Sequence, residues 1–383
     1  MNKNDKRFKE QIASVLDTDP QRIHLYWKGR VALFAMLKAA GIKAGDEVII
    51  PGFTCVVVPN AIIYSGAIPV YTDIQRKSLN PSFEDIRGAV TQKTRVIVLQ
   101  NTFGLSSDLE LITEWAAANG VLTIEDCTHG FGGKYKGRPN GTFCDAAFFS
   151  TQWNKPFSTG IGGFSAVFNT KLQESLTEVA KSLILPGWYD DAMLRGLIMS
   201  RKYLLTPATY YTLRSFYRLL SKLNLTIGSS SGDELRDPLM PVSYFKAMGK
   251  TQVNAGIHEI ATLDMVLSLR KKNAAIYTHV LAEHGKYHVS PDLHQNHSFL
   301  KYPVLVTNKK KFEDCARRER VDLGDWFVSP LHPVEKDFEK WHLSVENVPV
   351  SAYIANHVLN IPTDTTHPER VVALLEKNLD LLL

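Results

Sequence analysis

The chain has 383 residues, of which 44% are hydrophobic and 22% are charged, and its formal net charge is +5. This length accommodates one large domain and a smaller one, and the composition is that of an ordinary soluble globular protein. The small positive charge argues against nucleic acid as a partner but suits anionic ligands. Residues 1–16 contain no apolar segment of the signal-peptide type, so we expect a cytoplasmic protein.

Cysteine spacing and proline content narrow the class of protein further. Cys55, Cys127, Cys144 and Cys315 form no CxxC pair and no regular spacing, which indicates reduced cytosolic thiols, and we predict no metal site. The longest uncharged run, residues 48–72, is long enough to cross a membrane, but prolines and glycines interrupt it. It therefore predicts a strand, a turn, a helix and a second strand rather than a transmembrane helix.

The first chemically informative turn lies near the N-terminus. Residues 22–27 form a short apolar segment, and apolar residues recur at helical spacing from Val31 onward. Lys28, Gly29 and Arg30 lie between the two. A glycine turn that leads into a helix presents unpaired backbone N–H groups and the positive end of the helix dipole, so we expect an anion to bind there.

Short apolar runs then alternate with helical patterns. The predicted strands are residues 47–51, 68–72, 95–100, 121–125, 146–149 and 164–168. The predicted helices are residues 53–64, 106–119 and 171–182. This alternation is typical of an α/β fold with a mostly parallel sheet and helices on both faces. Ligands of such sheets bind beyond the carboxyl ends of the strands, where Asn101, Asp126 and Ser150 lie.

Residues 124–163 carry three groups that together predict a pyridoxal phosphate (PLP) site. PLP is an aldehyde, and Lys155 offers the primary amine that holds it as a Schiff base. Its ring nitrogen acts in the protonated form, which the carboxylate of Asp126 stabilises. Its phosphate needs hydroxyl and N–H donors, and Ser150 provides a hydroxyl at a strand end. We predict Lys155 and Asp126 as the catalytic residues.

The same stretch resembles the DegT/DnrJ/EryC1/StrS family of sugar aminotransferases, which are PLP enzymes of fold type I. The matching motif consists of Glu125-Asp126, His129, Phe149-Ser150, Lys155 and Gly162-Gly163. The resemblance implies a large domain built on a mostly parallel seven-stranded sheet and a smaller C-terminal α/β domain. It also implies that His129 positions the ring hydroxyl of PLP or supports Asp126.

Two further segments resemble the family and add cofactor contacts. Residues 51–74, PGFTCVVVPNAIIYSGAIPVYTDI, match almost position for position, which implies contacts from Thr54 and Cys55. Relatives often place an aromatic ring or a histidine where this chain has Cys55, so Phe53, His129 or something smaller covers the ring of PLP. The family's Ser-Gly-Thr phosphate segment corresponds to residues 28–30, so Gly29 is kept and Arg30 replaces a hydroxyl with a cation.

The second half of the chain sets the domain organisation. We predict a large domain over residues 1–254. Residues 255–383 form a linking helix, over residues 255–281, and the small domain. Residues 183–243 form an insertion, because this segment is longer than the corresponding segment of the family. We expect it to contain two amphipathic helices broken at Pro207, followed by a polar loop over residues 227–236. The favoured interpretation is a layer that packs on its own subunit or on a dimer mate, and the alternative is a basic membrane-surface element. The segment 326–332 resembles one that lines the substrate site of relatives.

The function that the resemblance implies is transfer of an amino group from an amino acid, L-glutamate, to a nucleotide-linked keto sugar for polysaccharide biosynthesis. The active sites of fold type I lie at subunit boundaries, so we expect a homodimer. Lys155 argues against a dehydratase of the same family, which has histidine there. Two alternatives stay open: another fold type I enzyme, either a lyase or an amino-acid aminotransferase, and a non-catalytic binding protein on the same scaffold.

Overall fold

A seven-stranded sheet lies at the centre of the computed structural model, which describes residues 2–204 and 233–383. In spatial order its strands are β1 (Ile23–Tyr26), β10 (Gly163–Val167), β9 (Ala146–Ser150), β6 (Leu122–Asp126), β5 (Thr94–Gln100), β2 (Glu47–Pro51) and β4 (Ile68–Thr72). Among these strands β10 alone runs antiparallel to its neighbours. The predicted α/β fold with a mostly parallel seven-stranded sheet is confirmed.

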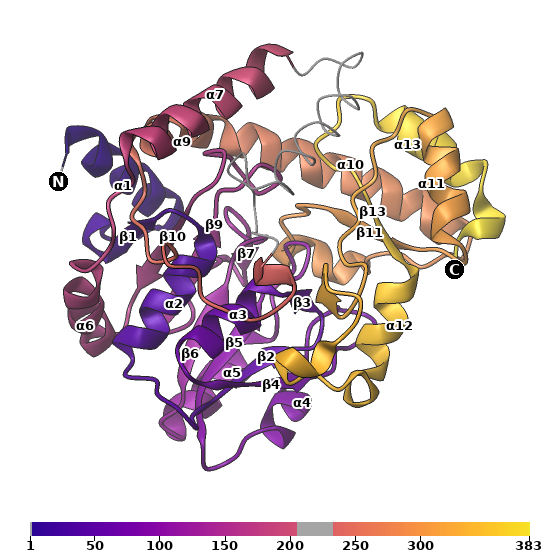
Figure 1. The fold of residues 1–383 in the computed structure, drawn as a ribbon. Coiled ribbons are helices and arrows are strands. Elements are labelled where there is room, and N and C mark those ends of the chain that lie inside the picture. The colour runs from indigo at the N-terminus through magenta and orange to yellow at the C-terminus, as the bar shows by residue number, and fades with distance from the viewer. Residues whose placement is uncertain (1, 205–232) are drawn as a thin grey trace.

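Helices cover both faces of the sheet because its strands alternate buried side chains between two cores (Figure 1). In β2, for example, Val48 and Ile50 enter one core and Ile49 the other. The first face packs against α2 (Gly29–Ala39), α3 (Val57–Tyr64) and α6 (Thr170–Ala180). The second face packs against α1 (Lys3–Leu16), α4 (Phe83–Gly88), α5 (Leu109–Ala118) and α9 (Lys250–Glu259).

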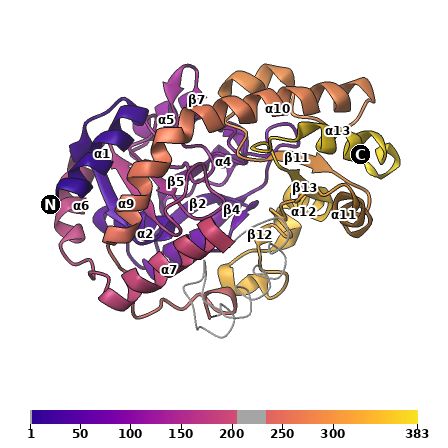
Figure 2. The same cartoon turned by 90° about the horizontal axis from the view of Figure 1, so that it is seen from above.

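A separate core lies in the C-terminal part of the chain, on one side of the molecule in both views (Figures 1 and 2). Its elements are α10 (Leu263–Glu283), the antiparallel strands β11 (Tyr302–Leu305) and β13 (Val358–Ile361), α11 (Lys309–Arg318) and α13 (Pro368–Glu376). The helix α12 (Pro349–His357) packs instead against residues such as Phe53 and Phe103 that follow strands of the large sheet. The domain boundary at residue 254 stays a prediction.

Two predicted elements differ from the structure. The helix expected from residue 53 begins at Val57, because Thr54–Cys55 form a short strand, β3, that pairs in parallel with β12 (Leu331–His332). The backbone N–H of Thr54 donates to the carbonyl of Pro330 at 2.9 Å. The single helix expected over residues 255–281 is two helices, α9 and α10, joined by the 3₁₀ turn Ile260–Thr262.

The described part of the insertion packs on its own subunit through α7 (Trp188–Leu204). Leu194 is fully buried, and Asp190 forms an ion pair with Lys246 at 2.8 Å. The helix predicted after Pro207 lies outside the described residues. Within the ranges that the structure describes, no helix has both the length and the apolar character needed to span a membrane.

Candidate active site

The carboxyl edge of the sheet brings together the residues predicted to bind the cofactor phosphate and ring nitrogen. Asp126 ends β6, and Ser150 ends the neighbouring strand β9. Gly163 begins β10 and pairs with both Ser150 and Tyr26, the last residue of β1. A Cβ added to Gly29 would lie 2.8 Å from the carbonyl oxygen of Phe149 and 3.1 Å from the Cβ of Ser150. The start of α2 therefore contacts the end of β9 directly.

Lys155 lies on the loop between β9 and β10. The loop is held by Thr151 and Thr159, whose hydroxyls are 2.6 Å apart and whose backbones form a 2.8 Å hydrogen bond. Burial lowers the pKa of Lys155 from its ordinary value of 10.5 to about 8; nearby Cys55 and Asp126 raise the pKa in part, and Arg30 lowers it further. A much larger share of this amine is therefore unprotonated at neutral pH than in an exposed lysine.

Asp126 is buried, and its hydrogen bonds differ from those of the adjacent Glu125. Its Oδ1 accepts the backbone N–H of Thr128 at 2.9 Å. Burial raises the pKa of Asp126, and Thr128 and Lys155 counter that effect only in part. Glu125 serves a structural role instead, since it accepts from the side-chain amide of Asn101 at 3.2 Å and from the N–H of Gly141 at 2.8 Å. Asp126 is thus the acid that is available to a cationic ligand.

His129 is buried and its tautomer can be assigned. Its Nδ1 lies 3.2 Å from the backbone nitrogen of Phe103, and an amide N–H can only donate. Burial, together with the nearby Lys155 and His332, keeps the pKa of His129 well below its usual range, so the ring is neutral. A neutral imidazole that accepts at Nδ1 carries its proton on Nε2. His129 therefore offers an Nε2–H donor, and its predicted contact with the cofactor stays a prediction.

Thr54 and Cys55 occupy the short strand β3 at the same edge. Thr54 is fully buried, and its hydroxyl donates to the side-chain carbonyl of Gln100 at 2.7 Å. Cys55 is half-buried and lies opposite His332 in the β3–β12 pair. Phe53 has no exposed surface, because Phe327 packs edge-on against it at 4.7 Å between ring centroids. The structure thus excludes Phe53 as an exposed ring wall.

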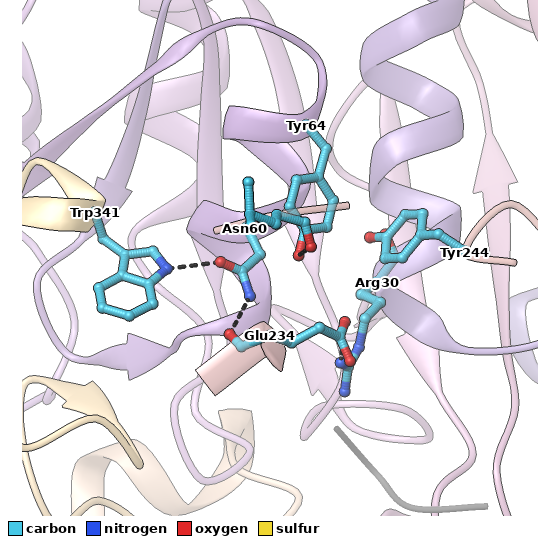
Figure 3. A network of polar contacts seen from close by, with 7 residues as sticks. Arg30, Asn60, Tyr64, Glu234, Tyr244 and Trp341 are labelled. Atoms are coloured by element: carbon cyan, nitrogen blue, oxygen red, sulfur yellow. Dashed lines mark hydrogen bonds and ion pairs between the residues drawn. The ribbon is translucent and has the colours of Figure 1, made fainter. Parts of the chain in front are cut away.

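Arg30 enters a buried polar network that the sequence did not predict (Figure 3). Its Nη1 lies 2.8 Å from Oε1 of Glu234, and both side chains are buried. The carbonyl of Glu234 accepts from the side chain of Asn60 at 2.9 Å, and Asn60 accepts in turn from the indole N–H of Trp341 at 2.6 Å. The hydroxyl of Tyr244 donates to the carbonyl of Arg30 at 3.1 Å. Arg30 is therefore paired within the chain, and its predicted contact with a phosphate stays a prediction.

Glu234 lies in the segment predicted as a polar loop, and no local pattern distinguished it. The described end of that loop and the residues just after it are anchored: Lys340 donates to the carbonyl of Arg236 at 3.0 Å, and the hydroxyl of Tyr64 donates to the carbonyl of Leu239 at 3.0 Å. A surface cavity of about 510 Å³ lies elsewhere, at the amino edge of the sheet beside Asp46, and takes no part in this site.

Comparison with known proteins decides the family. A model described as the DegT/DnrJ/EryC1/StrS aminotransferase family matches residues 6–191 and 229–375. The chain belongs to this family. Within the predicted insertion, residues 183–243, the family model leaves only residues 192–228 unmatched, so the departure from the family pattern is shorter than predicted.

Individual relatives either match a smaller part of the chain than the family model does or share fewer identical residues with it. GDP-perosamine synthase of Escherichia coli O157:H7 is 43% identical over 135 residues, which is 35% of this chain and 37% of the relative. GDP-perosamine synthase of Caulobacter vibrioides is 26% identical over 356 residues, 91% of this chain and 83% of the relative. The solved aminotransferase TlmJ from Streptoalloteichus hindustanus aligns with a TM-score of 0.75 at 19% identity, over 99% of this chain and 91% of that one. The last similarity shows a shared fold.

The Arg30–Glu234 pair makes a prediction about stability. Glu234→Ala leaves the buried guanidinium of Arg30 without its carboxylate, and we expect a loss of roughly 3–5 kcal/mol in the free energy of unfolding. The double variant Arg30→Met with Glu234→Leu should recover most of this loss, because it removes both charges. Urea unfolding measures the change.

The exposed pair of Lys181 and Glu178 provides the control. Glu178→Ala should change the free energy of unfolding by less than about 1 kcal/mol, since exposed pairs contribute little. Equal effects of Glu234→Ala and Glu178→Ala would show that the buried pair is not formed in solution.

Proposed function

We propose that the chain is a PLP-dependent aminotransferase that moves the amino group of an amino acid, L-glutamate, to a nucleotide-linked keto sugar. One observation carries the proposal: an amine whose pKa is lowered to about 8, on Lys155, lies beside the buried carboxylate of Asp126 at the carboxyl edge of the sheet. Family membership supports the reaction class. The relatives named GDP-perosamine synthase support a nucleotide-linked sugar as the acceptor.

The residues of the site fit PLP. The amine of Lys155 suits its aldehyde, the buried carboxylate of Asp126 its ring nitrogen, and the Nε2–H of His129 its ring hydroxyl. The phosphate group fits the start of α2, where Gly29 has no side chain to separate the helix from Ser150. Arg30, Thr54 and Cys55 complete the proposed contacts. When bound, PLP supplies an electron sink for the carbanion that forms at the amino acid.

The residues of the chain have different roles in the proposed reaction. Asp126 would hold the ring nitrogen of bound PLP, and its carboxylate would stabilise the proton on that nitrogen. Nζ of Lys155 removes the proton from Cα of the amino acid, and in the second half-reaction it returns a proton to the sugar carbon that receives the amino group. An amine with a pKa near 8 suits both directions, because its two protonation states are close in free energy near neutral pH.

The deciding experiment is the visible absorption spectrum of the protein with PLP, before and after L-glutamate is added. We expect the wild type to be yellow and to lose its colour with L-glutamate. Lys155→Ala should not form the yellow species, and Lys181→Ala, at an exposed lysine, should behave as wild type. A wild type that stays colourless with excess PLP would favour the non-catalytic binding protein. A yellow protein that responds only to other amino acids would refute glutamate as donor.

The pKa of Lys155 predicts how fast the cofactor is taken up at each pH. Only the unprotonated amine attacks an aldehyde, so the rate of covalent uptake should rise roughly tenfold per pH unit below pH 8 and level off above it. The measurement is the growth of visible absorbance after mixing apo-protein with PLP, divided by the same rate for a free lysine derivative. A ratio whose pH dependence shows no break near pH 8 would contradict the lowered pKa.

We further propose a homodimer, as fold type I implies. Exposed apolar side chains lie near the two ends of the insertion, including Leu185, Trp188 and Val242, whose exposed fractions are 79%, 83% and 100%. Contiguous exposed apolar patches mark contact surfaces in soluble proteins, and these residues are candidates for such a patch. Light scattering should give the mass of two 43.0-kDa chains. The mass of one chain at all concentrations would refute the dimer.

A further inference from the structure

We propose that Trp326 forms the aromatic wall of the cofactor site, a role that rests on the proposed PLP function. The indole of Trp326 stacks on the imidazole of His129, with 4.8 Å between the ring centroids and an angle of 3° between the planes. Nζ of Lys155 lies over the same indole, 4.4 Å from its centroid. One side chain thus contacts two of the residues that are proposed to bind PLP.

The C-terminal part of the chain holds Trp326 in this place. Asn360, which is fully buried in β13, accepts the backbone N–H of Trp326 at 3.1 Å and donates to its carbonyl at 2.7 Å. The backbones of Gly324 and Asn360 also exchange two hydrogen bonds, of 2.9 and 3.1 Å. Four hydrogen bonds therefore tie the segment before the indole to one residue. The indole itself is only half-buried, so part of its surface is available to a ligand.

The site needs such a wall because other residues do not supply it. Cys55 has no ring, and the ring of Phe53 is enclosed by neighbouring aromatic side chains. His129 has one face against Trp326 and its Nδ1 engaged by Phe103. Among the described residues, Trp326 is the one whose ring lies within cation–π distance of Lys155. The contact missing at Cys55 is thus supplied from a distant segment of the chain.

The chemistry of the indole matches that of the ligand. A pyridine ring that is kept protonated by Asp126 is electron-poor and carries positive charge. The face of an indole is electron-rich, and tryptophan is the best of the aromatic side chains at holding a cation over its ring. The wall therefore favours the protonated ring over the neutral one and acts in the same direction as Asp126. An aliphatic side chain of similar size would fill the space without this preference.

The test is the dissociation constant of PLP for the apo-protein, measured by absorbance without any amino acid or sugar. Trp326→Leu keeps bulk but removes the ring, and we expect the dissociation constant to rise roughly fivefold. Trp326→Phe restores a ring and should stay within about twofold of wild type. Trp115→Leu, at a half-buried tryptophan of α5 that packs against Phe83, is the matched control and should not change the constant.

Each outcome decides between the alternatives. Circular dichroism and the thermal midpoint verify that all variants fold. If Trp326→Leu binds PLP as tightly as wild type, the indole is not part of the wall. If it binds PLP more tightly, the indole instead obstructs the cofactor, and the proposal is overturned. If the wild type itself binds no PLP, the proposed function fails together with this inference, whereas the other two results refute the inference alone.

Discussion

The site depends on a close backbone contact between the start of α2 and the strands β9 and β10. Gly163 packs against the backbone of Gly29, and Gly29 packs against Phe149 and Ser150, so that a Cβ on either glycine would meet backbone atoms. Because β9 lies beside β6, this contact places an N-terminal helix end next to Asp126. The loop that carries Lys155 connects the same two strands, β9 and β10. The charged groups therefore meet as a consequence of strand order and of two residues without side chains.

Two pairs of opposite charge are buried at this edge, Lys155 with Asp126 and Arg30 with Glu234, and burial affects the two pairs differently. It lowers the pKa of Lys155 and raises that of Asp126, so each group is shifted toward its neutral form although the two are neighbours. A cationic ring nitrogen beside Asp126 would offset part of this cost, so the burial that penalises the free carboxylate strengthens binding of such a ligand. Arg30 and Glu234 instead compensate each other at 2.8 Å. The first pair suits the proposed chemistry, whereas the second joins two distant segments of the chain.

The sequence predicted those features that have a local cause. Six of the seven strands of the large sheet are predicted within one or two residues, since alternating or continuous apolar runs reveal a buried strand, whereas β1 is recognised only as a short apolar segment. Asp126, Ser150 and Lys155 could be singled out because they follow strand ends at family spacing. The strand β3 could not be predicted, because its partner β12 lies far along the chain. The break in the linking helix at residues 260–262 contains neither proline nor glycine, so it also had no local signal.

Glu234 and Asn360 escaped prediction for a related reason: each acts on a residue that is distant in sequence. Both belong to networks that end at the site. Asn360 fixes the backbone of Trp326, whose indole lies over Lys155. Trp341 binds Asn60, which holds the backbone of Glu234, the partner of Arg30.

The two networks give the C-terminal part of the chain a direct effect on the chemistry. The large sheet supplies the carboxylate, the amine and the helix start, while the C-terminal part supplies the aromatic surface beside the amine and an anchor for the partner of Arg30. A shift of that part by even an ångström would alter the surroundings of Lys155 and Arg30 together, because buried hydrogen bonds transmit displacement rather than absorb it. The precision of the site is therefore a property of how the C-terminal part packs against the large sheet, and the charged motif alone does not determine it.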